Sequence, residues 1–351
     1  MKLIVVIPAL NEALTIGGVI DRIPQDIPGV EQATAVVIDD GSTDDTAGVA
    51  RAAGARVISF PVNRGNGAAV AVGLEAALRD GADLVVTIDA DGQFNPDDIR
   101  HLVRPLLDGR HEFVTCSRFA RKESIPEMPG VKIWGNAAVT ALTNFIAGTK
   151  LTDASCGFRA YTREAALKMN VFSEFDYAQE GLVSLAARGV RIGEVSLPVR
   201  GVREFGNSRI AHNLFRFGGK CLSTLLRTLR DFRPLMFFGS IGAFFLLAGL
   251  ALGGWVLTHW ALTGETRPYT SFLTGSAVGL LVGVVLFVLA LVADLLGRVR
   301  RIIEQILFLS KSAHYDAIRR DARLTQLFRS EGETLHVARA AQSQHEERAA
   351  V

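Results

Sequence analysis

The sequence predicts an α/β domain with a mostly parallel sheet, followed by a membrane hairpin of two helices. Over roughly the first 200 residues, short β-branched runs alternate with Ala-rich stretches of helical character, as in successive strand–helix–strand units. Further along, residues 234–264 and 268–293 contain no formally charged side chain. We therefore place the α/β domain at 1–208, a linking segment at 209–233, the hairpin at 234–297 and a C-terminal tail at 298–351.

The strands predicted in the first domain end in polar side chains. The runs LIVVIP, TAVVIDD, ARVISF and DLVVTIDAD each precede a helix-like segment, which indicates a parallel sheet. The polar residues at or just after the strand ends are Asn11, Glu12, Asp39, Asp40, Asp89 and Asp91. In open α/β sheets the ligand crevice lies outside the carboxyl ends of the strands. We therefore expect a binding site at this edge of the sheet.

Asp89 and Asp91, at the end of the fourth run, permit three interpretations. They could cap the next helix, although Asn95 before Pro96 already fits that role. They could belong to a calcium loop, but the periodic oxygen ligands of an EF-hand are missing. They could also hold Mg²⁺ or Mn²⁺ and leave the other coordination positions to a diphosphate, because a divalent cation would remove the repulsion between the carboxylates. The motif alone leaves these alternatives open.

Two glycine-containing segments lie close to these carboxylates in the predicted topology. In IDDGSTDDT, Asp39 and Asp40 can accept hydrogen bonds from a ribose or a base, and Gly41 permits a tight turn. In NRGNGAAVAVG, Gly65 and Gly67 stand at a helix start, where free backbone N–H groups favour anions. The segment is neither a Walker A loop nor a GxGxxG fingerprint, so the sequence supports neither a kinase nor a dinucleotide enzyme.

Composition narrows the choice of partner and compartment. The net charge of +2 over 351 residues gives no support to nucleic-acid binding, and we expect no nucleic-acid partner. Cys116, Cys156 and Cys221 show no metal-ligand or paired spacing, so we expect reduced thiols of a cytoplasmic domain. The N-terminus is not expected to be a signal peptide, because Pro8 ends its apolar run after five residues.

The two uncharged runs are predicted to span a membrane, at about 235–260 and 270–295. About 20 apolar helical residues cross a bilayer core, and each run is long enough. The arginines that flank the spans are Arg227, Arg230, Arg233, Arg298, Arg300 and Arg301. The positive-inside rule therefore places both ends of the chain in the cytoplasm.

The segments on either side of the hairpin carry many charges. Residues 209–233 predict either a helix packed on the first domain or a basic amphipathic helix on the cytoplasmic leaflet. The tail from Lys311 onward is charged and Ala-rich, and we expect it to be helical in part and frayed at its end.

Seven motifs, taken together and in order, resemble a known enzyme family. They are VVIPALNE, VIDDGSTDDT, NRGNGAAVAVG, TIDADGQFNPDDI, SRF, DASCGFRAY and REFGNSR. The combination is similar to the polyprenyl-phosphate glycosyltransferases, family-2 enzymes with the Rossmann-like GT-A fold that include dolichyl-phosphate mannose synthase and bacterial undecaprenyl-phosphate glucosyltransferases. The resemblance covers roughly residues 2–209 and extends to a membrane hairpin after the catalytic domain.

The resemblance implies a reaction and its partners. The donor would be a nucleoside-diphosphate sugar, the acceptor undecaprenyl or dolichyl phosphate, and the cofactor Mg²⁺ or Mn²⁺. A phosphate acceptor is largely anionic at pH 7, so a single in-line displacement with inversion needs little help from a general base. The protein would be integral to a bacterial inner membrane or its equivalent, with its catalytic domain in the cytoplasm. Two spans per chain allow homo-oligomers, and no motif specifies an interface.

The resemblance also implies roles for individual residues. The donor would contact Pro8, Ala9, Asn11, Glu12, Asp39, Asp40, Gly41 and Ala90. The metal would be held by Asp89, Asp91 and Gln93. The phosphates would meet Arg118, Arg159, Arg203, Ser208 and Arg209, and the catalytic set would be Asp89, Asp91, Arg118 and Asp153. Asp153 is expected to position the acceptor rather than act as an obligatory base. Arg209 stands where the family more often has lysine, which keeps the charge and changes its geometry.

Three other functions fit less well. A processive polysaccharide synthase should carry a QxxRW motif and more spans, and this sequence has no such string. An inactive assembly protein would not need the intact Asp39, Asp89 and Asp91. A flippase-like transporter would need a polar site within the membrane, and only Asp294 at a boundary is available. The sequence does not identify the sugar or the nucleotide.

Overall fold

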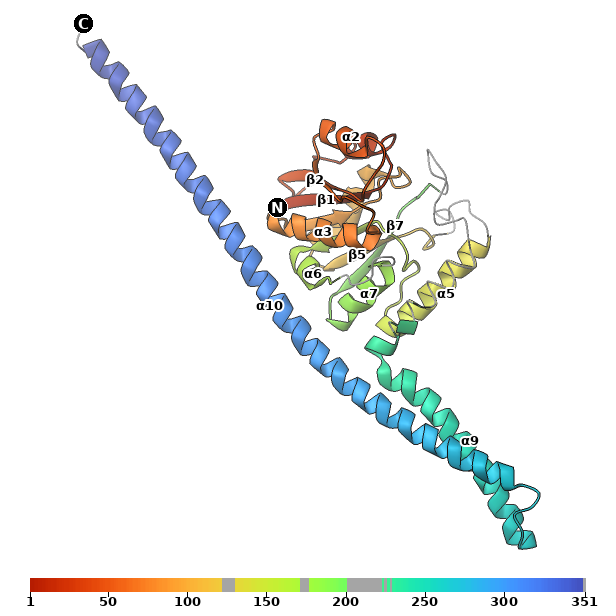
Figure 1. Cartoon of the computed structure of the whole chain (residues 1–351). Helices are drawn as coiled ribbons and strands as arrows, with labels where there is room; N and C mark the ends of the chain where they lie inside the picture. Colours follow the sequence, from red (N-terminus) through yellow and green to blue (C-terminus); the bar gives the residue numbers. More distant parts are fainter. Residues whose placement is uncertain (122–129, 171–176, 201–222, 224–225, 228, 350–351) are drawn as a thin grey trace.

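The computed structural model describes residues 1–121, 130–170, 177–200, 223, 226–227 and 229–349. Figure 1 shows an α/β domain, a two-helix hairpin extending away from it, and a long C-terminal helix that runs back past the domain. The predicted linking segment at 209–233 lies largely outside the described residues, as does Cys221.

Within the described residues, seven strands form one sheet in the order β3-β2-β1-β4-β6-β5-β7. The strands are β1 (Lys2–Ala9), β2 (Gln32–Asp39), β3 (Arg56–Ser59), β4 (Leu84–Thr87), β5 (Phe113–Ser117), β6 (Arg159–Thr162) and β7 (Ile192–Ser196). Only β6 runs against its neighbours β4 and β5, and the other pairings are parallel. The predicted α/β fold with a mostly parallel sheet is confirmed.

Helices cover both faces of this sheet. Those of the α/β domain are α1 (Ile16–Asp21), α2 (Thr46–Ala52), α3 (Asn66–Arg79), the 3₁₀ turn η1 (Pro96–Asp98), α4 (Ile99–Leu107), α5 (Gly130–Ala147), α6 (Arg163–Lys168) and α7 (Tyr177–Ala187). Leu3 and Val5 of β1 join the core beneath α1 and α4, whereas Ile4 joins the core beneath α3 and α7. Strands buried on both faces read as continuous apolar runs, which is why LIVVIP shows no alternation.

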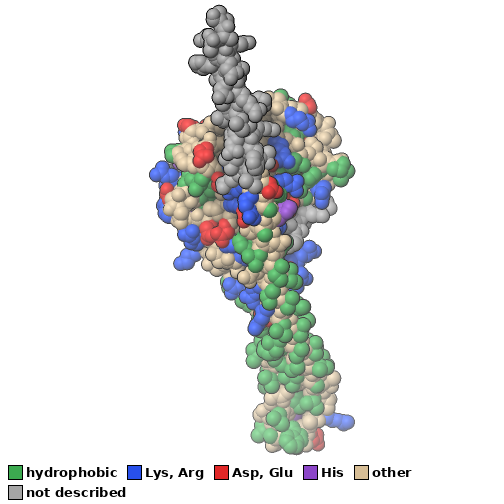
Figure 2. Space-filling view, turned by 90° about the vertical axis from the view of Figure 1, so that its left-hand side faces the viewer, with side chains coloured by type: hydrophobic (Ala, Val, Ile, Leu, Met, Phe, Trp, Pro, Cys, Tyr) green, Lys and Arg blue, Asp and Glu red, His purple; other side chains and the backbone are tan. Residues whose placement is uncertain are grey.

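The hairpin consists of α9 (Pro234–Thr263) and the first part of α10 (Thr270–Ala349). The most apolar windows of these helices have mean hydropathies of 2.2 and 2.8, and only 11% and 22% of them is buried. They are therefore long and apolar enough to cross a bilayer, and they are not core helices of the α/β domain. Figure 2 shows hydrophobic side chains over the hairpin, with Lys and Arg where it meets the domain.

Small residues let the two helices of the hairpin approach closely. A methyl group on Gly279 would lie 3.2 Å from the Cα of Gly249. The hydroxyl of Ser276 donates to the carbonyl of Gly249 at 2.7 Å. Close backbone approach and interhelical hydrogen bonds of this kind are typical of helix pairs in membranes, where apolar burial alone drives association weakly.

The predicted tail is not a separate segment, because α10 continues without a break from Thr270 to Ala349. Where the helix passes the α/β domain, Tyr315 is 6% exposed and belongs to the core beneath α3 and α7. Salt bridges join the helix to the domain on either side of this ring. They are Arg188–Glu304 at 3.1 Å, Arg163–Asp316 at 2.9 Å and Arg319–Asp83 at 2.7 Å. The tail is therefore docked on the domain.

Replacing Tyr315 with alanine tests this docking. Tyr315→Ala should lower the free energy of unfolding by about 2–4 kcal/mol, because it leaves a cavity in the cluster. The melting temperature of the protein in detergent should then fall by roughly 5–15 °C. Arg320→Ala, which changes an exposed residue of the same helix, is the matched control and should change stability by less than about 0.5 kcal/mol. Equal melting temperatures for the two variants would contradict the docking.

Candidate active site

Three neighbouring strands bring the predicted polar residues to one edge of the sheet. In the strand order, β1 lies between β2 and β4. Ala9 at the end of β1 is in register with Asp39 at the end of β2, and Val6 of β1 is in register with Thr87 at the end of β4. The side chains that follow these strands therefore share one acidic edge, which consists of Asn11, Glu12, Asp39, Asp40, Asp89 and Asp91. This placement agrees with the sequence prediction.

The loop after β1 is fastened to the loop after β2. Asn11 adopts a left-handed conformation with φ 53°, and its side-chain oxygen accepts from the backbone N–H of Thr43 at 2.7 Å. The backbone N–H of Asn11 donates to the Ser42 hydroxyl at 2.9 Å, and that of Glu12 donates to the Thr46 hydroxyl at 2.8 Å. These bonds preorganise the corner where the donor was predicted to bind. Pro8 is half-buried there, whereas the side chains of Ala9 and Ala90 are buried.

Asp39 and Asp40 have different environments, although they are adjacent and both buried. One oxygen of Asp39 accepts from the backbone N–H of Ser42 at 3.0 Å. The two oxygens of Asp40 accept from the backbone N–H groups of Arg64 at 2.7 Å and Gly65 at 3.0 Å. In this structure the carboxylate of Asp40 therefore holds the loop before α3, and its predicted donor contact stays a prediction. For the same reason, the N–H of Gly65 is not available to an anion.

Gly41 allows the loop after β2 to pass close to the loop before α3. Its φ is +75°, and a methyl group on it would lie 2.7 Å from the carbonyl carbon of Val62 and 2.8 Å from the nitrogen of Asn63. No larger residue fits here without moving backbone. Gly41 therefore shapes the predicted donor corner through its backbone.

The Asp-x-Asp turn follows β4. Asp91 is 5% exposed, and one of its oxygens accepts from the backbone N–H of Gln93 at 3.1 Å. The side-chain amide of Gln93 donates to the carbonyl of Arg200 at 3.2 Å, so part of this predicted ligand is engaged with the segment after β7. Asn95 accepts from the N–H of Asp97 at 3.2 Å and caps η1. The structure thus gives the cap role to Asn95 rather than to the Asp pair.

Two residues that the sequence did not single out lie against Asp89. A methyl group on Gly157 would lie 3.1 Å from one Asp89 oxygen and 3.4 Å from the hydroxyl of Tyr177. That hydroxyl is buried and has no hydrogen-bond partner among the described residues. Burial raises the pKa of Tyr177 well above its ordinary value, and the Asp89 charge raises it further. The phenol is therefore neutral, and Gly157 allows the backbone to approach Asp89 closely.

The donor atoms at the Asp-x-Asp turn fit a small hard cation. Among the described residues, no three His, Cys, Asp or Glu side chains gather as a metal cluster. Mg²⁺ and its like are commonly bound through one or two carboxylates, with phosphate and water oxygens completing the coordination. Asp89 and Asp91 supply two carboxylates from one turn, so they fit a metal that a diphosphate shares.

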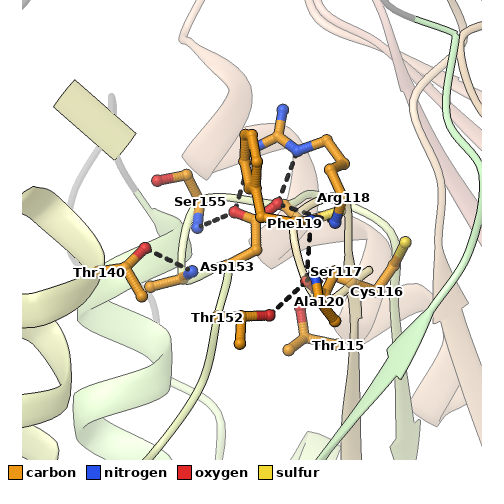
Figure 3. Close-up of polar contacts among 12 residues, drawn as sticks. Thr115, Cys116, Ser117, Arg118, Phe119, Ala120, Thr140, Thr152, Asp153 and Ser155 are labelled. Carbon is orange, nitrogen blue, oxygen red and sulfur yellow. Dashed lines mark hydrogen bonds and ion pairs between the residues drawn. The ribbon is translucent and has the colours of Figure 1, made fainter. Parts of the chain in front are cut away.

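A second polar cluster lies at the end of β5, where Arg118 pairs with Asp153 (Figure 3). Asp153 is fully buried, and its two oxygens accept from Nε of Arg118 at 2.6 Å and from Nη2 at 3.1 Å. Burial lowers the pKa of Arg118, but the hydrogen bonds and charge of Asp153 outweigh it and raise the pKa above its usual range. The guanidinium of Arg118 therefore keeps its charge. A carboxylate bound in this way is poorly placed to act as a general base, and the positioning role of Asp153 stays a prediction.

Comparison with known proteins identifies the family. Residues 4–169 match the family model described as Glycosyl transferase family 2. Glycosyltransferase AglJ of Haloferax volcanii is 31% identical over 297 residues, which cover 84% of this chain and 93% of that relative. The chain belongs to glycosyl transferase family 2.

Other relatives have names that contain a lipid phosphate. The UDP-N-acetylglucosamine–dolichyl-phosphate N-acetylglucosaminyltransferase of Methanococcus voltae is 30% identical, over 55% of this chain and 83% of its own. Further relatives are named as dolichyl-phosphate, polyprenol or undecaprenyl-phosphate transferases or synthases. Glucosyl-3-phosphoglycerate synthase of Mycobacterium tuberculosis, solved with Mn²⁺, UDP-glucose and phosphoglyceric acid, aligns with a TM-score of 0.51 and 31% identity, over 65% of this chain and 79% of that one. The predicted GT-A fold is confirmed.

In this family-2 chain, the loop that carries Asp153 is held from two sides. Glu194 of β7 accepts from the backbone N–H groups of Thr152 at 2.9 Å and Asp153 at 3.0 Å. Thr140 of α5 accepts from the N–H of Ala154 at 3.1 Å. The sequence reading missed these supports, because they come from elements 14 and 41 residues away from the residues that they hold.

The structure gives Arg159 a structural role. The side chain is fully buried, and its three nitrogens donate to the carbonyls of Cys156, Ala178 and Ala154 at 2.8, 2.9 and 3.1 Å. In this structure every guanidinium nitrogen of Arg159 therefore donates to a backbone carbonyl, and its predicted phosphate contact stays a prediction. Arg203, Ser208 and Arg209, the other predicted phosphate contacts, lie outside the described residues.

Removing the arginine of the buried pair tests its contribution. Arg118→Met should lower the free energy of unfolding by about 3–5 kcal/mol, because it leaves the Asp153 carboxylate buried without its partner. The melting temperature should fall by roughly 10 °C. Arg121→Met, which changes an exposed arginine close by in the chain, is the control and should melt close to the unchanged protein. Adding Asp153→Asn to Arg118→Met should recover part of the loss, and a double variant no more stable than Arg118→Met would contradict the charge argument.

Proposed function

We propose that this protein transfers one sugar from a nucleoside-diphosphate sugar to a polyprenyl phosphate, with inversion at the anomeric carbon. The observation that carries the proposal is the combination of two parts in one chain. A family-2 domain bears Asp89 and Asp91 at the acidic edge, and a hairpin able to cross a bilayer is joined to that domain. The names of the relatives support a lipid-phosphate acceptor.

The donor is assigned to the acidic edge. Asn11, Glu12 and Asp39 surround the corner between β1 and β2, where carboxylate and amide oxygens can accept from ribose or base. Asp89 and Asp91 would hold Mg²⁺ or Mn²⁺, which when bound neutralises the diphosphate and stabilises the departing nucleoside diphosphate. The Mn²⁺ and UDP-glucose in the solved synthase of this fold support that assignment.

The acceptor is assigned to the neighbourhood of Arg118. A phosphate monoester has its second pKa near 6, so at pH 7 the attacking oxygen is already largely anionic and needs no base. It needs its charge screened as it approaches the diphosphate. Asp153 binds Nε and Nη2 of Arg118 and thereby fixes the plane of the guanidinium, while Nη1 is not part of that pair. The side chain of Arg118 is 22% exposed, so a ligand can reach it.

The membrane topology follows from the flanking arginines. Arg233 precedes α9, and Arg298, Arg300 and Arg301 lie on α10 beyond the apolar windows. The positive-inside rule assigns this side, and with it the catalytic domain, to the cytoplasm. Tethering the domain to the bilayer raises the effective concentration of a lipid acceptor.

A donor screen with matched variants tests the proposal. Membranes containing the protein are incubated with radiolabelled nucleotide sugars and polyprenyl phosphate, and label in the lipid phase is counted. Asp91→Asn should reduce transfer by at least about 100-fold, because the leaving diphosphate loses its metal ligand. Asp97→Asn, which changes an exposed carboxylate six residues further on, should leave transfer nearly unchanged.

Removing the metal in the same assay tests the metal assignment independently of the variants. Chelation should abolish transfer, and added Mn²⁺ or Mg²⁺ should restore it in the unchanged protein only. Full turnover by Asp91→Asn would contradict the metal assignment. A product carrying many sugars on each lipid would instead favour a processive synthase.

A further inference from the structure

Helix α5 (Gly130–Ala147) exposes an apolar stripe that the proposed function does not use. Val131, Trp134 and Phe145 are 63%, 80% and 58% exposed. With Ala138 and Ala141, which are also exposed, they recur at spacings of three and four residues and so share one helical face. From residue 133 to residue 149 the chain contains no charged side chain. Singly exposed apolar residues are ordinary, but a continuous uncharged stripe marks an interaction surface.

The opposite face of α5 holds the loop that carries Asp153. Thr140 accepts from the backbone N–H of Ala154 at 3.1 Å. Asn144 donates to the carbonyl of Leu151 at 2.7 Å and accepts from its N–H at 3.0 Å. Asp153 lies between these two attachment points. Whatever fixes the outer face of α5 therefore also fixes the position of the Arg118–Asp153 pair.

The position of α5 indicates what covers its apolar stripe. Arg233, the residue before the first helix of the hairpin, donates from Nε to the carbonyl of Ile146 at 3.2 Å. Figure 1 shows α5 beside the start of α9, running across the direction of the hairpin rather than along it. The helix thus lies at the level where α9 would enter the bilayer. An amphipathic helix in that position lies in the plane of the membrane surface, with its apolar face toward the acyl chains and Trp near the head groups.

We propose that α5 is a membrane-surface helix, and that the lipid bilayer covers the stripe formed by Val131, Trp134, Ala138, Ala141 and Phe145. The membrane then binds the catalytic domain directly, in addition to holding the hairpin. Through Thr140 and Asn144, insertion of α5 sets the position of the Asp153 loop relative to the lipid head groups. This second part rests on the proposed transfer to a lipid phosphate, whereas the first part does not.

Fluorescence quenching by lipids tests the insertion without any assay of activity. In a Trp255→Phe/Trp260→Phe background, Trp134 is the remaining tryptophan. The protein is reconstituted in bilayers whose lipids carry bromine at shallow or deep acyl positions. Trp134 should be quenched, and more strongly by the shallow label. The control adds Trp134→Phe and Arg51→Trp, which places the probe on exposed α2, at the far side of the domain from the hairpin in Figure 1, and it should not be quenched.

Two outcomes of this measurement overturn the proposal. Emission typical of water with no quenching means that the stripe is exposed to solvent. Blue-shifted emission that bromine does not quench means that protein, such as a second copy of the chain, covers the stripe.

The link to the reaction is tested with substitutions on the stripe. Trp134→Glu and Phe145→Glu should lower transfer to polyprenyl phosphate in bilayers roughly 10-fold or more, because the acceptor site shifts relative to the head groups. Binding of the donor nucleotide and the melting temperature in detergent should not change. Ala52→Glu, which changes an exposed apolar residue on α2, is the control and should leave transfer unchanged.

These measurements show which of the claims fails: the insertion of α5, its link to the reaction, or the proposed function. Unchanged transfer by Trp134→Glu and Phe145→Glu, together with quenching of Trp134, overturns the link between α5 and the reaction. A protein that transfers no sugar to any lipid phosphate overturns the proposed function, while the quenching result still decides the insertion of α5.

Discussion

The carboxylate of Asp153 is buried and must be paired, and the contacts that pair it and hold its loop determine the structure of the part of the domain to which we assign the acceptor. Asp153 has no exposed surface, and an unpaired charge in such a place would cost several kcal/mol. Arg118 satisfies it from the end of β5, while Glu194 and Thr140 hold the backbone on either side of it. Strand β5, strand β7 and helix α5 therefore meet at this loop because the ion pair requires a fixed geometry.

Local signals were sufficient to predict the acidic edge. A strand that ends in carboxylates can be recognised from a short stretch of sequence, and parallel topology brings such ends together. Asp39, Asp40, Asp89 and Asp91 follow this rule. The backbone partners of Asp40 and Arg159 could not be predicted, because they come from elsewhere in the chain: the N–H groups of residues 64–65 and the carbonyl of Ala178. In the sequence alone, a charged residue that binds backbone groups looks the same as one that binds a ligand. The two can be told apart only when the fold shows which backbone groups lie beside the side chain.

The roles of two helices, α5 and the C-terminal part of α10, were not predicted from the sequence, for a related reason. The tail was expected to be helical in part and frayed at its end, and its charged, Ala-rich composition did not show that Tyr315 and three ion pairs dock it on the domain. The apolar stripe of α5 could have been found from its spacing and from the absence of charge between residues 133 and 149. What the spacing could not supply is the attachment of Ile146 to Arg233, which places the stripe beside the hairpin.

Together these contacts limit how the domain can move relative to the hairpin. A hairpin joined through a single linker would leave the domain free to rotate, and the acidic edge would meet the bilayer only part of the time. Docking of α10 through Glu304, Tyr315 and Asp316 removes most of that freedom. If α5 lies against the lipid surface as we propose, it would be a second support that fixes the height of Arg118 above the head groups. Under the proposed function, a lipid phosphate diffusing in the leaflet would then meet a site already at its own level, and less orientational entropy would be lost when the two anions are brought together.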